Sequence, residues 1–314
     1  MRQLPLANGD VLPALGLGTW RVEPGQVGAV VRQALELGYR HVDAAPIYGN
    51  EAEIGVALER ALADGVVRRD ALWITSKLWN DSHAPEDVRP ALERTLADLR
   101  LSYLDSYLIH WPVAQRRGVR WPERAEDLIP LERLPLARTW AAMEALQAAG
   151  LCRHIGVSNL SLAKLQGLLA EARQPPALLQ VESHPWLQQP ELLAFCPRHG
   201  VVLTAYSPLG AGRDGQLSPV LADPELVAIA RRVGASPAQV ALAWGLDRGT
   251  AVIPKAVRPE HRAANWAAQD LVLEAEALDR LARLDRRQRF VEGRLWLLPD
   301  GPYNAANLWD GPPR

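Results

Sequence analysis

The chain has 314 residues, 48% of them hydrophobic, and a formal net charge of -1. This length allows one large core or two ordinary domains. The nearly neutral charge provides no basic field for nucleic acid or an anionic membrane, so we expect neither as a partner.

Targeting and redox signals are few. The two cysteines, Cys152 and Cys196, are too few for a disulfide framework and lack the spacing of a metal site. The N-terminus has no apolar run of the signal-peptide type, and no stretch is long and apolar enough to span a membrane. We therefore expect a cytoplasmic protein without a bound metal.

The predicted elements begin with a hairpin and continue as an alternation of strands and helices. Asn8-Gly9 separates two short apolar segments within residues 3–16, which is typical of a β-hairpin. Apolar runs predict strands at 15–18, 39–43, 71–76, 103–109, 154–157, 178–182 and 201–206, and a last one ending at 252–253. Helical patterns are found at 25–37, 51–63, 85–99, 138–149, 162–172, 190–199, 224–233, 237–247, 259–266 and 274–284.

Local signals place some of the helix starts. Asn50 followed by Glu53 has the form of a capping box, which predicts a helix beginning at residue 51. Ser236 before Pro237 predicts an N-cap followed by proline at the first helical position.

Eight strand–helix units follow one another without a linker, which favours a (β/α)8 barrel formed by residues 1–314 as a single domain. A doubly wound open sheet is the alternative, but it needs a Gly-x-Gly-x-x-Gly turn, and residues 16–21 lack the third glycine. We expect residues 112–135 to be a long connection. We expect residues 291–314, which show no periodicity, to lie as a loop over the active-site end of the barrel.

In such a barrel the functional side chains follow the strand ends. Polar or aromatic residues occupy these positions in most units. They are Trp20, Asp43, Tyr48, Lys77, His110, Ser158, Asn159, Gln180, Tyr206, Ser207 and Lys255. Each has an ordinary alternative: residues 41–51 alone read equally well as a surface turn, and a lone His110 would more often be structural. Only their joint occurrence at one edge favours a site.

Four of these residues make chemical sense as a group. A free tyrosine titrates near pH ~10 and is a poor proton donor at neutral pH. A lysine ~4 Å away would favour the phenolate by roughly 4 kcal/mol, so we expect Lys77 to lower the pKa of Tyr48 by about three units. Asp43 would keep the lysine charged, and His110 would orient a substrate oxygen. This is the requirement of carbonyl reduction by hydride transfer.

The tetrad Asp43, Tyr48, Lys77 and His110 resembles that of the aldo-keto reductase superfamily, in particular its aldehyde and aldose reductase branch. Surrounding motifs match along nearly the whole chain. They are Gly-Thr-Trp at 18–20, Trp-Ile-Thr-Ser-Lys-Leu-Trp-Asn at 73–80, Tyr-Leu-Ile-His-Trp-Pro at 107–112, Gly-Val-Ser-Asn at 156–159, Gln-Val-Glu-Ser-His-Pro at 180–185, Ala-Tyr-Ser-Pro-Leu-Gly at 205–210 and Ile-Pro-Lys at 253–255.

The resemblance implies a role for each matching residue. Tyr48 would be the general acid, tuned by Lys77 and Asp43, with His110 orienting the carbonyl. The resemblance also implies the cofactor contacts. Thr19, Trp20 and Asp43 would lie beside the cofactor, while Ser158, Asn159 and Gln180 would bind the carboxamide and Tyr206 would stack on the nicotinamide ring. Ser207 and Leu209 would contact the pyrophosphate, and Lys255, His261 and Asn265 would lie at the adenosine end.

The sequence departs from the family pattern at the adenosine 2′-phosphate. Ala256 replaces a usual hydroxyl and His261 a usual arginine, which weakens phosphate recognition. Arg258 and Arg262 are nearby candidates to replace the lost contact. We therefore expect NADP(H) to be preferred, with measurable use of NAD(H). The loop at 210–223 looks short for a belt over the cofactor, which favours faster exchange.

The implied substrate pocket is aromatic. Trp20, Ile47, Trp79 and Trp111 would wall it, together with parts of the 112–135 and 291–310 loops, whereas we expect Trp73 to fill the core. An apolar pocket with one polar end suits aromatic, aliphatic and short sugar aldehydes, and ketones or aldoses are further candidates.

Two rival functions remain open. A nicotinamide-binding regulatory or structural protein could use the same barrel, although an intact tetrad favours the enzyme. A barrel glycosidase would need paired carboxylates at strand ends, where only Asp43 and Glu182 are available. The resemblance also implies a monomer with a small carbonyl substrate as its partner.

Overall fold

The structure, a computed structural model, describes residues 1–212 and 216–310. Its centre is a sheet of eight parallel strands in the order β3-β4-β5-β6-β9-β10-β11-β12. Their bounds are β3 Leu17–Gly18, β4 His41–Asp43, β5 Trp73–Leu78, β6 Leu104–Ile109, β9 Cys152–Ser158, β10 Leu178–Glu182, β11 Val202–Tyr206 and β12 Ala251–Val252. All eight predicted strands are present.

The two edges of the sheet meet and close the barrel. Val252 N donates to Ala14 O at 2.7 Å, and Gly16 N donates to Val252 O at 2.9 Å. A Cβ on Gly18 would lie 2.6 Å from Ile253 O, so only glycine allows the edges to approach this closely. The predicted (β/α)8 fold is confirmed.

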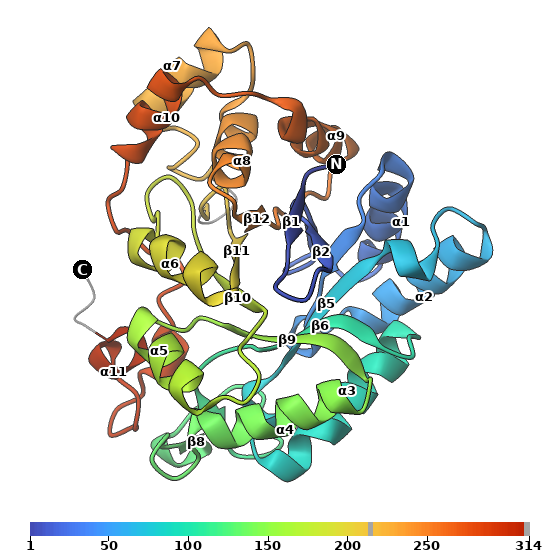
Figure 1. Ribbon diagram of the computed structural model, residues 1–314, viewed down its shortest axis with the longest axis vertical. Coiled ribbons are helices and arrows are strands. Elements are labelled where there is room, and N and C mark those ends of the chain that lie inside the picture. The colour runs from blue at the N-terminus through green and yellow to red at the C-terminus, as the bar shows by residue number, and fades with distance from the viewer. Residues whose placement is uncertain (213–215, 311–314) are drawn as a thin grey trace.

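Helices surround the strands on the outside of the barrel (Figure 1). Their bounds are α1 Val27–Leu37, α2 Glu51–Ala63, α3 Pro85–Leu99, α4 Leu136–Ala148, α5 Leu162–Glu171, α6 Pro190–Phe195, α7 Pro224–Arg232, α8 Pro237–Asp247, α9 Pro259–Ala267, α10 Ala275–Ala282 and α11 Ala305–Trp309. In α1 the buried side chains recur every three or four residues, so one face of the helix packs on the barrel. None of the described helices is long and apolar enough to cross a membrane.

The predicted hairpin is present at the N-terminus. Strands β1 (Gln3–Pro5) and β2 (Val11–Pro13) pair antiparallel. Leu6 and Leu12 belong to one apolar cluster with Trp73, which is 3% exposed. Trp73 therefore fills the core, as expected.

The predicted helix start at residue 51 is correct, but the capping box is wrong. Asn50 makes no side-chain cap; its Nδ2 donates instead to Thr19 O at 3.0 Å. The Glu53 carboxylate accepts the backbone N–H groups of Gly25 and Gly28, each at 2.9 Å. Both side chains thus use partners distant in sequence. The N-cap predicted at Ser236 is confirmed, and it forms a capping box with Gln239.

The connection and the tail contain more structure than predicted. Residues 112–135 include the short antiparallel pair β7 (Ala114–Gln115) and β8 (Leu128–Ile129). The tail forms a 3-10 turn at Arg294–Trp296 and the helix α11, in which Asn304 caps the N–H of Asn307. The tail was therefore wrongly predicted as an unstructured loop, except that residues 311–314 lie outside the described part.

Tyr303 attaches the tail to the connection. Its hydroxyl accepts the N–H of Ala114 at 2.9 Å and donates to Ile129 O at 2.6 Å. The tail thereby lies over the barrel end that bears Trp79 and Trp111, which share a cluster with Trp296.

Candidate active site

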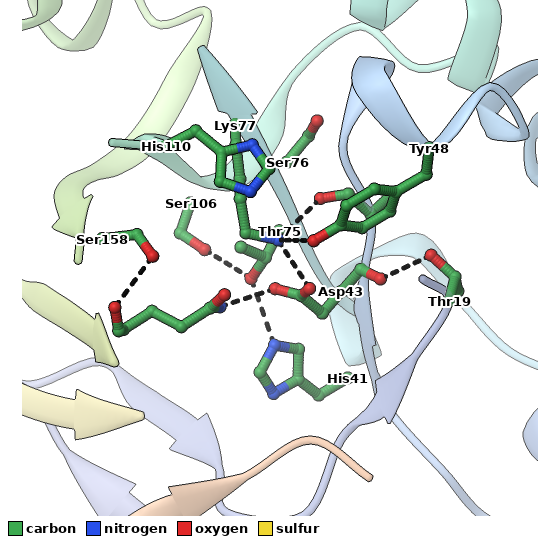
Figure 2. A network of polar contacts seen from close by, with 12 residues as sticks. Thr19, His41, Asp43, Tyr48, Thr75, Ser76, Lys77, Ser106, His110 and Ser158 are labelled. Carbon is green, nitrogen blue, oxygen red and sulfur yellow. Dashed lines mark hydrogen bonds and ion pairs between the residues drawn. The ribbon is translucent and has the colours of Figure 1, made fainter. Parts of the chain in front are cut away.

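Lys77 is the centre of a polar network at the carboxyl ends of β4 and β5. Its Nζ donates to Asp43 Oδ1 at 2.6 Å, to Ala44 O at 3.0 Å and to the Tyr48 hydroxyl at 3.2 Å (Figure 2). Tyr48 is on the 3-10 turn Pro46–Tyr48 directly after β4. Lys77 lies within β5 rather than past its end, so the expected strand boundary at residue 76 is wrong by two residues.

Burial dominates the electrostatics of this network. It raises the pKa of Tyr48 well above 10, and the charges of Asp43 and Glu51 act in the same direction. Burial also lowers the pKa of Lys77, against the raising effect of Asp43. The expectation that Lys77 would lower the pKa of Tyr48 is therefore wrong for the net shift, because desolvation of the phenolate outweighs the lysine. The phenol stays protonated and able to donate.

His110 follows β6 and faces the phenol. Its ring is edge-on to Tyr48 and to Trp79, with ring centroids 5.8 and 5.1 Å away. Burial, with the charges of Lys77 and His83, lowers its pKa well below 6.5. His110 is therefore a neutral imidazole at physiological pH, able to donate one hydrogen bond without adding a charge.

Amide side chains extend the network along the sheet edge. Gln180 Nε2 donates to Asp43 Oδ2 at 2.7 Å, while Asn159 Nδ2 donates to His110 O at 2.9 Å. The Tyr206 hydroxyl donates to Asn159 Oδ1 at 2.7 Å. Asn159 adopts a φ of 61°, a left-handed conformation that costs free energy in a non-glycine residue and concentrates at functional sites.

These residues open into one cavity of about 480 Å³. The predicted residues that line it are Thr19, Trp20, Asp43, Ile47, Tyr48, Trp79, His110, Trp111, Ser158, Asn159, Gln180, Tyr206, Ser207, Leu209 and Lys255. Two predicted contacts on α9 do not line it: His261 is exposed, and Asn265 is 4% exposed. A larger hollow of about 650 Å³ lies between α5, α6 and residues 285–310, and it contains no member of the tetrad.

Part of the cavity wall comes from residues that were not predicted individually. Trp121 comes from the connection, while Arg294, Leu295 and Trp296 come from the tail. The sequence predicts the loops as parts of the pocket wall but not their individual residues, because no periodicity places side chains there. The tryptophans in these loops are the sequence feature that could have indicated these wall residues.

The cavity suits an elongated ligand with amide and phosphate groups. The buried residues Ser158, Asn159 and Gln180 line it with a hydroxyl and two carboxamide groups. The cavity is also lined by Lys255, which is exposed and whose one hydrogen bond among the described residues is a 3.5 Å contact to Arg21 O. A nicotinamide dinucleotide has this distribution of groups, so the residues fit such a cofactor.

Glu51 lies behind the network and supplies a pH-dependent stability. Its carboxylate, 3% exposed, accepts from Ser76 Oγ at 2.5 Å and from Thr95 Oγ1 at 3.3 Å. Burial raises its pKa from 4.5 to about 7, against these lowering hydrogen bonds.

A raised acid pKa contributes stability below about pH 4.5 that is lost as the pH rises through about 7. We expect Glu51→Gln to remove this dependence, on the order of 3 kcal/mol between the two limits. Urea denaturation across this pH range measures it. A variant curve parallel to that of the wild type would contradict the prediction.

The sequence profile of the Aldo/keto reductase family matches residues 14–286. The chain belongs to the aldo/keto reductase family. An aldo/keto reductase of Synechocystis, slr0942, is 51% identical over 99% of this chain and 97% of its own length. The human aldo-keto reductase family 1 member A1 is 45% identical over 91% of this chain and 90% of its own length.

A solved structure agrees with these sequence relatives. The aldose reductase from Schistosoma japonicum superposes with a TM-score of 0.87 at 40% identity, covering 94% of this chain and 96% of that one. Membership makes the chain an oxidoreductase, because aldo/keto reductases reduce carbonyl compounds with nicotinamide cofactors.

Proposed function

We propose that this aldo/keto reductase reduces aldehydes to alcohols with NADP(H), with Tyr48 as the general acid. Ketones and aldoses are further substrates of the same chemistry. The observation that carries the proposal is the hydrogen-bonded chain Asp43–Lys77–Tyr48, which ends in a cavity beside the neutral His110.

Each tetrad member has one task. A bound nicotinamide cofactor would supply the hydride. The Tyr48 hydroxyl delivers its proton to the carbonyl oxygen, which gains negative charge as the hydride reaches the carbon. Lys77, held charged by Asp43, stabilises the phenolate left behind. His110 donates a hydrogen bond to the same oxygen and sets its angle.

The substrate end of the cavity is aromatic. Trp20, Trp79 and Trp111 supply apolar surface, with Trp121 and Trp296 from the two covering loops. A pocket of this kind binds the apolar body of an aldehyde and leaves its oxygen at Tyr48 and His110. This supports aromatic and aliphatic aldehydes as the substrate class.

We also propose that the chain works as a monomeric single-domain enzyme in the cytoplasm, with a small carbonyl compound as its partner. A formal net charge of -1 supports the proposal that neither nucleic acid nor membrane is a partner. The alternative is a nicotinamide-binding regulatory protein, which predicts cofactor binding without turnover.

We expect kcat/KM with NADPH to exceed that with NADH by about 10-fold, because Lys255 and Arg258 present cations at the adenosine end while the hydroxyl and arginine usual in the family are missing. Oxidation of both cofactors, measured with a panel of aldehydes, gives the ratio. Equal or reversed values would refute the preference. Binding without turnover of any carbonyl would favour the regulatory protein.

A further inference from the structure

Arg262 lies beneath the segment 255–258. This segment carries the exposed cations Lys255 and Arg258 at the proposed adenosine end of the cofactor site. Arg262 is 2% exposed, although it belongs to the surface helix α9. Its guanidinium donates to Ala256 O at 3.1 Å, to Val257 O and to the side chain of Gln33 on α1. Arg262 therefore holds two successive carbonyls of this segment from the inside.

Helix α9 packs closely against the end of α1. The Tyr39 hydroxyl donates to Arg262 O at 3.1 Å, and the Tyr39 ring lies 5.1 Å from that of Trp266. At Gly38 a Cβ would lie 2.7 Å from the Trp266 ring, so the end of α1 and α9 are in close contact. The Arg262 guanidinium is buried on Ala256, Val257 and Gln33, so it does not present its charge at the surface as a direct phosphate ligand would.

The buried guanidinium has three neutral acceptors. Among the described residues, no carboxylate lies within ion-pair distance of it, and the nearby Glu260 contacts Arg258 at 3.7 Å on the exposed side. Burial lowers the pKa of Arg262, yet a guanidinium remains protonated. An arginine buried without an anion is costly, and a multiply charged anion placed above the segment would offset that cost.

We infer that Arg262 is a positioning residue for the adenosine 2′-phosphate. By holding Ala256 and Val257 it keeps Lys255 and Arg258 on the outer side of the segment, and its own charge favours a phosphate over a hydroxyl there. This inference rests on the proposed function. It accounts for a preference for NADP(H) in a chain that has Ala256 and His261 where the family has stronger phosphate ligands.

The test compares Arg262→Met and Arg262→Lys with a matched control. Arg40→Met is suitable, because Arg40 Nη1 also donates to two backbone carbonyls at the end of α1, those of Leu35 and Tyr39. Dissociation constants of NADPH, NADH and 2′,5′-ADP are measured by quenching of tryptophan fluorescence, and the Tm of each variant is recorded.

We expect Arg262→Met to weaken NADPH and 2′,5′-ADP by about 10-fold and NADH by less than 3-fold, which lowers the NADPH preference. Arg262→Lys should retain part of the preference because it keeps the charge, and Arg40→Met should leave it unchanged. If Arg262→Met does not fold, a fall of about 3-fold in the preference of Arg262→Lys supports the inference and an unchanged preference refutes it.

Two results would overturn the inference while leaving the proposed function intact: a wild-type preference that Arg262→Met leaves unchanged, or equal weakening of NADPH and NADH together with a lowered Tm. The second is the signature of a merely structural role. A wild type that binds both cofactors equally would refute the proposed preference itself, and the inference with it.

Discussion

Tyr48→Phe is expected to lower kcat/KM for aldehyde reduction by about 10²- to 10⁴-fold, the usual contribution of a positioned general acid. The variant keeps the ring but removes the hydroxyl that lies 3.2 Å from Lys77 Nζ. Burial raises the pKa of this phenol, so at neutral pH the wild type always has the proton available. Steady-state kinetics with an aromatic aldehyde measure the loss.

Tyr107→Phe is the matched control for this variant. Tyr107 is also a buried tyrosine, in a core cluster shared with residues of the surrounding helices, but its hydroxyl has no hydrogen-bond partner among the described residues. Its removal should leave kcat/KM within about 3-fold of the wild type, because no interaction is lost. The dissociation constant of NADPH should be unchanged in both variants. Activity of Tyr48→Phe within 10-fold of the wild type would refute the role of the hydroxyl.

Lys77→Met is expected to destabilise the protein by about 3–5 kcal/mol as well as to abolish most of the activity. Lys77 and Asp43 form an ion pair whose side chains are 0% and 3% exposed. Removing the lysine leaves a buried carboxylate with the Gln180 amide as its remaining side-chain donor, and an uncompensated buried charge is strongly destabilising. Urea denaturation and steady-state kinetics check the two effects.

Two further variants separate the loss of the pair from the loss of packing. Adding Asp43→Asn to Lys77→Met removes the uncompensated charge, so the double variant should recover part of the lost stability while remaining inactive. Arg89→Met breaks an exposed pair with Glu93, which is expected to change stability by less than about 1 kcal/mol. Lys77→Met with a stability change as small as that of Arg89→Met would contradict the prediction.

Much of the fold and of the site could be predicted from local patterns. Apolar runs gave all eight strands, and α3 and α8 have the predicted bounds because proline and a capping serine mark their starts. The tetrad was predicted because side chains at the carboxyl ends of neighbouring parallel strands must lie together. These properties depend on residues close in sequence or on the regular geometry of a barrel.

Tertiary structure alone determined the features that depend on long-range hydrogen bonds and on desolvation. Asn50 and Glu53 do not cap their own helix, because their side chains bind backbone groups some thirty residues earlier in the chain. Asn50 Nδ2 donates to the Thr19 carbonyl, and the Glu53 carboxylate accepts the Gly25 N–H. Arg262 is buried partly through its contact with Gln33 on α1, and the tail is structured through the contact of Tyr303 with the connection. The pKa of Tyr48 rises despite Lys77, because the cost of burying the phenolate depends on every atom around it. Sequence therefore determined which groups meet, and packing determined their charge and orientation.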